Sequence, residues 1–189
     1  MRLISYAHQG RTGFGAVKGE GIVDLAKATG NASLLELLQA GTLAQVGAIV
    51  ERSEADLRLS DVQLLPPVPN PGKIICVGLN YLEHVEESGR VVTAKPALFA
   101  RYPESQVGHL SPMVKPLESD KFDYEGELAV VIGKGGRRIS EADALSHVAG
   151  YSCYNEGSIR DWQHHTSQFV AGKSFVGTGG FGPWLVTAD

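Results

Sequence analysis

Two glutamates stand two positions apart at the start of an apolar segment. Glu125 and Glu127 flank Gly126, and the apolar run 128–132 follows directly. Residues two apart in a strand point to the same face, so both carboxylates would stand side by side. Carboxylate oxygens are the ligands that Mg²⁺ and Mn²⁺ prefer. From this motif alone, a solvated strand end with two exposed glutamates is the more common outcome.

A third acidic side chain follows another apolar segment. Glu156 comes directly after an expected strand over 148–155, and it could supply a third carboxylate to the same cation. The alternative is purely structural. In that case Asn155 or Ser158 caps a helix, and Arg160 and Asp161 form a local charge pair. The segment by itself leaves both interpretations open.

His84 and Glu87 are three residues apart in an expected helical turn over 80–87. This spacing places both side chains on one helix face. A carboxylate beside a histidine orients the ring and raises its basicity, which suits a general base acting on water. Considered alone, a surface helix with a charged face explains the same pattern.

Lys173 is preceded by Gly172 at an expected strand-to-loop junction. A lysine in such a place could face a developing oxyanion or enolate and stabilise its charge. The alternative for an isolated lysine is a solvated side chain on the surface.

Length and composition limit the possible functions. The chain has 189 residues and a formal net charge of -4, without a run of Lys and Arg, which does not favour a nucleic-acid partner. No apolar run is long enough to span a bilayer, and the first residues lack the apolar core of a signal peptide. Cys76 and Cys153 have no partner at metal-ligand spacing, so we expect buried free thiols. These features predict a cytoplasmic protein with no membrane partner.

The elements that must position these side chains fall into two units, with a proline-rich boundary after residue 68. In the first unit the patterns predict strands over 2–6, 13–17, 21–25 and 62–65, and helices from Ser33 and over 43–50. In the second they predict strands over 73–79, 97–101, 128–132 and 148–155, and a short helix from Ser140 to His147. We expect the strand over 73–79 to be buried, because it is almost continuously apolar.

Taken in order, the motifs of residues 69–189 resemble the fumarylacetoacetate hydrolase superfamily. The pieces are Gly78-Leu79-Asn80-Tyr81 with His84 and Glu87, Pro96-Ala97-Leu98-Phe99, Asp123–Gly133, Tyr154–Gln163 and Gly172-Lys173-Ser174-Phe175. The resemblance implies an α+β fold: a mixed β-sandwich or β-roll catalytic domain over 69–189, with a small α/β N-terminal domain over 1–68. Members of the superfamily continue past the Gly-Pro-Trp segment, so we expect this catalytic domain to be incomplete.

The resemblance also implies residue roles. Glu125 and Glu127 correspond to two ligands of a Mg²⁺ or Mn²⁺ ion, and Glu156 corresponds to the third, which is usually an aspartate. The remaining predicted site residues are Lys173 and the pair His84 and Glu87 as catalytic groups, and Gln163 and Arg101 as substrate contacts.

The function implied by the resemblance is hydrolysis of a C–C bond in a small β-diketo acid of the acylpyruvate type. The divalent metal would act as a Lewis acid, and His84 would activate water. A second possibility is isomerisation or decarboxylation of 2-oxo or 2-hydroxy-dienedioic acids in aromatic catabolism. A third, from another class, is a non-catalytic oligomerising module. The resemblance also predicts a homodimer.

Overall fold

The structure is a computed structural model that describes residues 1–87, 89 and 94–189, and the side chains of His84 and Glu87 fall outside that description. The strands are β1 (Arg2–His8), β2 (Arg11–Lys18), β3 (Gly21–Asp24), β4 (Leu57–Arg58), β5 (Gln63–Leu64), β6 (Ile74–Gly78), β7 (Ala97–Arg101), β8 (Gln106–Val107), β9 (Phe122–Asp123), β10 (Gly126–Ile132), β11 (Val148–Glu156), β12 (Ser158–Ile159) and β13 (Gly179–Thr187). The α-helices are α1 (Ala26–Thr29), α2 (Leu34–Gln39), α3 (Leu43–Arg52), α4 (Leu82–Glu87), α5 (Arg160–Gln163) and α6 (Val170–Lys173). Short 3₁₀ helices cover Leu59–Asp61, Pro103–Ser105 and Glu141–His147.

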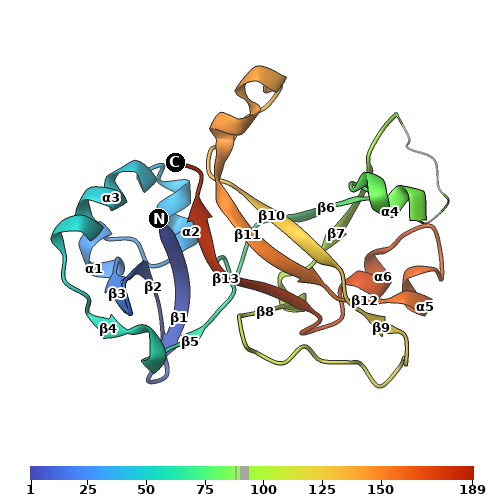
Figure 1. The fold of residues 1–189 in the computed structure, drawn as a ribbon, viewed down its shortest axis with the longest axis horizontal. Helices are drawn as coiled ribbons and strands as arrows, with labels where there is room; N and C mark the ends of the chain where they lie inside the picture. Colours follow the sequence, from blue (N-terminus) through green and yellow to red (C-terminus); the bar gives the residue numbers. More distant parts are fainter. Residues whose placement is uncertain (88, 90–93) are drawn as a thin grey trace.

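One large sheet joins both halves of the chain. Within the described residues its order is β10-β11-β13-β1-β2-β3-β4, with β5 paired to β1 and β8 paired to β13. The link is the antiparallel pair of β1 and β13, in which Leu3 lies opposite Leu185, and Figure 1 shows the two strands side by side near both termini. The domain boundary after residue 68 stays a prediction, and the sheet continues across it.

The N-terminal half packs apolar side chains on both faces of its strands. Leu3 and Ile4 are adjacent in β1 and point to opposite faces, so they belong to two separate core clusters. Leu34 and Leu37 of α2 pack into the cluster that contains Leu3. The predicted start of this helix is confirmed, because the Oγ of Ser33 accepts a hydrogen bond from the amide of Glu36.

The strand predicted over 73–79 forms as β6, but the expectation that it is buried is wrong. Ile75 is 57% exposed and Val77 is 42% exposed. The reason is that, among the described residues, β6 pairs only with β7, in a two-stranded sheet of which one face is uncovered. Side chains alternate along the strand, so Cys76 points to the covered face while its neighbours face outward.

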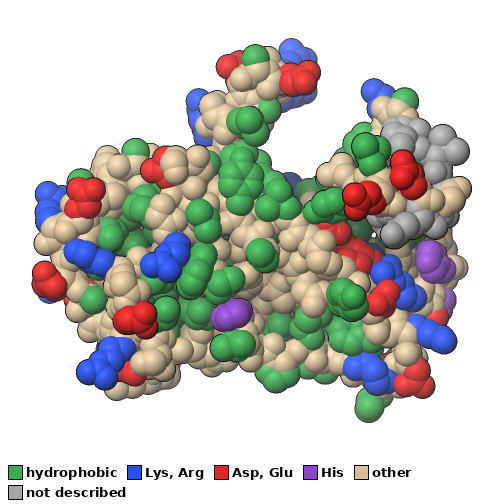
Figure 2. All heavy atoms as spheres, viewed as in Figure 1, with side chains coloured by type: hydrophobic (Ala, Val, Ile, Leu, Met, Phe, Trp, Pro, Cys, Tyr) green, Lys and Arg blue, Asp and Glu red, His purple; other side chains and the backbone are tan. Residues whose placement is uncertain are grey.

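Strand β10 shows the same alternation at the edge of the large sheet. Leu128, Val130 and Ile132 are exposed, whereas Ala129 and Val131 pack against the core. Figure 2 shows hydrophobic side chains on the surface in the region of the β10–β11 hairpin. The alternation places Glu127 on the inward-facing side of the strand.

Two smaller expectations need correction. Cys153 is exposed rather than buried, because it points to the uncovered side of β11. The helix predicted after Ser140 forms as a 3₁₀ helix, and the Oγ of Ser140 caps it by accepting from the amide of Asp143. Among the described residues, no helix is long and apolar enough to cross a membrane.

Candidate metal centre

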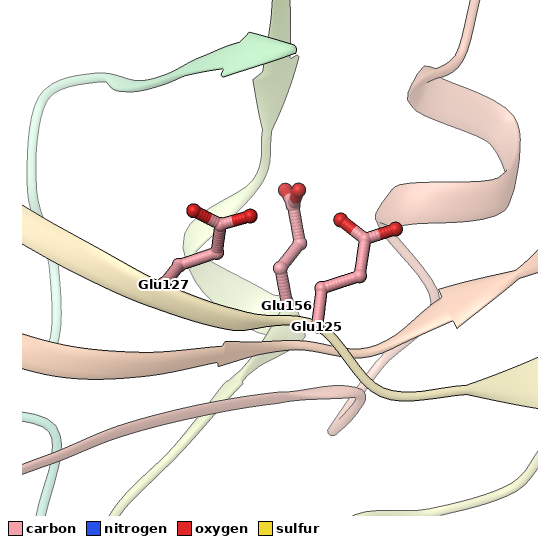
Figure 3. Close-up of side chains that lie close together, drawn as sticks. All are labelled: Glu125, Glu127 and Glu156. Atoms are coloured by element: carbon pink, nitrogen blue, oxygen red, sulfur yellow. The ribbon is translucent and has the colours of Figure 1, made fainter. Parts of the chain in front are cut away.

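Three glutamate side chains converge at the end of the β10–β11 hairpin. Glu125 directly precedes β10, Glu127 lies in β10, and Glu156 is the last residue of β11. One carboxylate oxygen from each of the three lies within 4.8 Å of the other two. Figure 3 shows the carboxylates pointing to the same side of the two strands. The strand pairing causes this convergence, because Gly126 lies opposite Asn155 and brings the two chain segments into register.

Lys173 lies between two of these carboxylates. Its ammonium Nζ is 2.9 Å from both oxygens of Glu125 and 3.0 Å from Oε2 of Glu156. The side chain is 2% exposed, so it is not the solvated lysine of the alternative interpretation. Its position also differs from the expected strand-to-loop junction, because Lys173 ends the short helix α6.

Gly172 allows α6 to approach α5 closely. A Cβ at this position would lie 2.3 Å from the backbone nitrogen of Gln163 and 2.6 Å from the carbonyl oxygen of Ile159. Both obstructing atoms belong to the backbone and cannot rotate away. The glycine therefore lets Lys173 reach the glutamates.

The electrostatic surroundings separate Glu125 from Glu127. Burial favours the protonated form of Glu125, but its hydrogen bond and charge interaction with Lys173, helped by Arg160, outweigh burial and hold its pKa below the ordinary value. Burial raises the pKa of Glu127, and repulsion from Glu156 and Glu125 adds to the increase. Glu127 is therefore the carboxylate whose negative charge is least compensated by the protein.

Glu156 is buried against groups that donate to it. The thiol of Cys76 donates to its Oε1 at 2.9 Å, and Nη1 of Arg101 lies 3.6 Å from the same oxygen. Arg101 is 2% exposed, and its guanidinium also donates to the carbonyl oxygen of Gly157 and to Oγ1 of Thr178, both at 3.0 Å. The guanidinium of Arg101 is thus occupied by contacts with Glu156 and its neighbourhood, and its role as a substrate contact stays a prediction.

Gln163, predicted to contact substrate, ends helix α5 and is 9% exposed. Its Oε1 accepts a hydrogen bond of 3.0 Å from Nη1 of Arg160, and the same nitrogen donates to Oε1 of Glu125. The charge pair of Arg160 with Asp161, which belonged to the structural alternative, is not among the contacts of the described residues. Arg160 binds Asp123 at 2.9 Å, and Asp161 accepts from Ser119 at 2.6 Å.

The predicted general base, His84, and its partner Glu87 belong to helix α4, but both side chains lie outside the described residues. The residue before this helix is described. The hydroxyl oxygen of Tyr81 accepts a hydrogen bond of 3.3 Å from the amide of Leu128 in β10. This contact ties the N-terminal end of α4 to the strand that carries Glu127.

The residues present fit a hard divalent cation. The donor set consists of three carboxylates, which suits Mg²⁺ or Mn²⁺ and not a soft metal. Three carboxylates at this separation repel one another: burial first, and then repulsion from Glu156 and Glu125, raise the pKa of Glu127 despite the nearby charge of Lys173. A divalent cation bound to Glu125, Glu127 and Glu156 would supply the missing positive charge.

Comparison with known proteins supports the family and the fold. The sequence profile of the fumarylacetoacetate (FAA) hydrolase C-terminal family matches residues 73–189. Among solved structures, a putative HpcE protein from Mycobacterium smegmatis superimposes with a TM-score of 0.84 at 34% identity, covering all of this chain and 67% of that one. The maleylpyruvate hydrolase from Sphingobium, solved with manganese(II) and pyruvate, gives a TM-score of 0.79 at 27% identity, covering 100% of this chain and 68% of that one. The predicted resemblance and fold class are confirmed.

Several of the curated relatives are named as oxaloacetate tautomerases. The mitochondrial oxaloacetate tautomerase fahd2 of Xenopus laevis is 40% identical over 158 residues, which cover 82% of this chain and 50% of the relative. The chain thus spans about half the length of the curated relatives that it matches.

Proposed function

The chain belongs to the fumarylacetoacetate hydrolase family, and we propose that it contributes the metal centre of a divalent-metal-dependent enzyme that interconverts the keto and enol forms of an oxaloacetate-type 2-oxo acid. The observation that carries this proposal is the convergence of the carboxylates of Glu125, Glu127 and Glu156, with the ammonium of Lys173 bound to the first and the last of them. The reaction is taken from relatives that are named oxaloacetate tautomerases. Because the match spans about half of those relatives, the activity of a whole protein is part of the proposal.

The proposed site residues have two roles, which are to stabilise negative charge and to orient the substrate. When bound by the three carboxylates, Mg²⁺ or Mn²⁺ would polarise the 2-oxo carbonyl and offset negative charge on its oxygen. Lys173 supplies a further fixed positive charge, because its contacts with Glu125 and Glu156 hold it in place. Gln163 would donate a hydrogen bond to a substrate oxygen.

Tautomerisation moves one proton between the carbon beside the carbonyl and the carbonyl oxygen, and no carbon–carbon bond breaks. The carbon acid needs a base to remove its proton. We assign this role to His84, oriented by Glu87, on the sequence resemblance.

Hydrolysis of a C–C bond is the second candidate. It is favoured by the likeness to the maleylpyruvate hydrolase, whose structure contains manganese and pyruvate. The hydrolase must position a water for attack on a carbonyl, whereas the tautomerase must exclude this attack. The products separate the two reactions, because only hydrolysis yields two acids from one substrate.

The decisive experiment follows the loss of the enol form of oxaloacetate by its ultraviolet absorbance, with Mg²⁺ or Mn²⁺ and with EDTA. We expect metal-dependent acceleration that disappears in Glu125→Ala and Glu127→Ala and persists in Glu141→Ala, which removes an exposed carboxylate outside the site. Acceleration that persists in both site variants would overturn the metal assignment. A parallel assay with an acylpyruvate detects hydrolysis, and absence of metal binding in calorimetry would favour the non-catalytic module.

Cellular location and assembly also stay proposals. We propose a cytoplasmic homodimer, although the curated relatives are named as mitochondrial proteins. Sedimentation at several protein concentrations tests the dimer, and fractionation of cells tests the location.

A further inference from the structure

Arg160 touches both a proposed metal ligand and the proposed substrate contact. It is the first residue of α5 and directly follows β12, which pairs with β9 so that Ser158 lies opposite Asp123 (Figure 1). The backbone amide of Arg160 also donates to the carbonyl oxygen of Lys121 at 2.9 Å. This hydrogen bond extends the β9–β12 pairing by one residue and holds the main chain of Arg160 in place.

The guanidinium of Arg160 uses two edges for two purposes. Nε donates to Oδ2 of Asp123 at 3.0 Å, and Nη2 forms an ion pair with the same oxygen at 2.9 Å. This double contact fixes the plane of the group, because the guanidinium is rigid and flat. The remaining nitrogen, Nη1, is then directed at Oε1 of Glu125 and Oε1 of Gln163.

The contact with Arg160 determines which end of the Gln163 amide faces the arginine. A guanidinium has only donors, so the amide must present its oxygen to it. The two N–H bonds of Nε2 are then directed away from Arg160. Among the described residues, Nε2 donates to no protein group, although the side chain is largely buried.

We propose that Arg160 is a positioning residue that fixes the Gln163 amide with its NH₂ group toward the substrate. This inference rests on the proposed function, and it adds a specificity rule to it. The substrate must present an acceptor oxygen, from a carboxylate or a carbonyl, at the point that Gln163 reaches. Asp123 anchors Arg160 and thereby sets this orientation from outside the metal centre.

Two variants of Gln163 separate donation from packing. Gln163→Glu keeps an oxygen that can accept from Arg160, so the local structure is retained, but at neutral pH its carboxylate has no N–H to donate. Gln163→Ala removes both contacts. Both variants should weaken binding of pyruvate, used as the probe, by about tenfold or more in the presence of saturating Mn²⁺, as expected for loss of one hydrogen bond to a charged group.

A double-mutant cycle tests whether Arg160 acts through Gln163. We expect Arg160→Met to weaken pyruvate binding by a similar factor in the wild-type background and to have little further effect in Gln163→Ala. Affinity for Mn²⁺ alone, measured by calorimetry, should change much less, because Lys173 and Ser158 still bind Glu125. Arg160→Gln, which keeps one amide donor, replaces Arg160→Met if thermal melting shows that the methionine variant does not fold.

The possible results lead to separate conclusions. Unchanged pyruvate affinity in a folded Arg160 variant, or fully additive losses in the cycle, overturns the positioning role while the proposed function stands. Failure of the wild-type chain to bind pyruvate with Mn²⁺ bound overturns the proposed function and this inference with it.

Discussion

The backbone amide of Glu156 donates a hydrogen bond of 2.8 Å to the carbonyl oxygen of Glu125. Two of the three proposed metal ligands are thus joined through their main chains, and the third, Glu127, lies two residues after Glu125, within β10. A main-chain hydrogen bond of this kind fixes the positions of the Cα atoms from which the side chains extend before any cation binds. The candidate centre is therefore built on hydrogen-bonded backbone, so little conformational entropy of the main chain is lost when a metal binds.

Replacement of Lys173 by methionine should destabilise the metal-free protein and make its stability depend on metal. Among the described residues, the change leaves the buried carboxylate of Glu156 with Arg101 and Cys76 as its remaining partners, and loss of one member of a buried pair costs roughly 3 kcal/mol. Added Mg²⁺ or Mn²⁺ should recover part of the loss, because it replaces the missing positive charge. Thermal unfolding in EDTA and in each metal measures both effects.

Lys115→Met is the matched control for that experiment. Lys115 also forms a lysine–carboxylate pair, with Asp120 at 2.9 Å, but both side chains are exposed. Exposed ion pairs contribute little to stability, so Lys115→Met should change the melting temperature much less than Lys173→Met, and metal should not alter the result. Equal melting temperatures for Lys173→Met and wild type in EDTA would contradict the structural role assigned to Lys173.

The candidate site was partly predictable from the sequence, and the limit has a physical cause. Strand alternation alone placed Glu125 and Glu127 on one face. Assigning Glu156 as the third metal ligand required the resemblance, because its contact with Glu125 depends on the pairing of two strands separated by the segment 133–147. Arg160 was missed because its partner, Asp123, lies 37 positions earlier, whereas an aspartate stands directly beside it in the sequence.

The fold shows a similar division between local and distant causes. The capping residue Ser33 and the apolar spacing after it predicted α2 correctly. The apolar composition of β6 did not reveal that one of its faces is uncovered, because exposure depends on what other segments pack there. The same reason explains the exposed side chain of Cys153.

Substitution of Gly172 by alanine should displace α6 and weaken the metal centre. The new methyl group would overlap backbone atoms of Gln163 and Ile159, so the helix must move and carry Lys173 with it. Overpacking of this kind costs about 1–3 kcal/mol. Thermal unfolding and Mn²⁺ titration should both show the loss, whereas Gly135→Ala, where no atom lies within 4 Å of the new Cβ, should leave both unchanged. A fully stable Gly172→Ala with wild-type Mn²⁺ affinity would contradict the close contact.

The two cysteines should differ sharply in reactivity. Burial raises the pKa of the Cys76 thiol, and the neighbouring carboxylate of Glu156 raises it further, so Cys76 stays protonated at neutral pH. Cys153 is exposed. Brief treatment of the native protein with iodoacetamide should therefore give one adduct, at Cys153, and treatment after denaturation should give two. Peptide mass spectrometry identifies the sites, and an early adduct at Cys76 would refute the assignment.

Glu127→Gln should stabilise the metal-free protein at neutral pH and strongly reduce its stabilisation by metal. The folded state raises the pKa of Glu127 through burial and repulsion, so the folded protein holds this proton more tightly than the unfolded chain, whose glutamates titrate at about pH 4.3. Below that pH the acid is neutral in both states, and the variant and wild type should be equally stable. As the pH rises, ionisation favours the unfolded wild type, and the variant gains a relative advantage that is complete above the raised pKa.

Metal should reverse the order of stabilities in the same experiment. With Mg²⁺ or Mn²⁺ present at neutral pH, the wild type gains the free energy of cation binding, whereas the variant lacks one charged ligand and gains much less. Thermal melts of both proteins between about pH 4 and pH 8, in EDTA and in metal, measure the two effects. The same type of substitution at an exposed residue outside the site, Glu141→Gln, should show neither effect. A Glu127→Gln protein that is less stable than wild type in EDTA at pH 7 would show that the carboxylate of Glu127 is compensated by the protein itself, and that no cation is needed to balance the three glutamates.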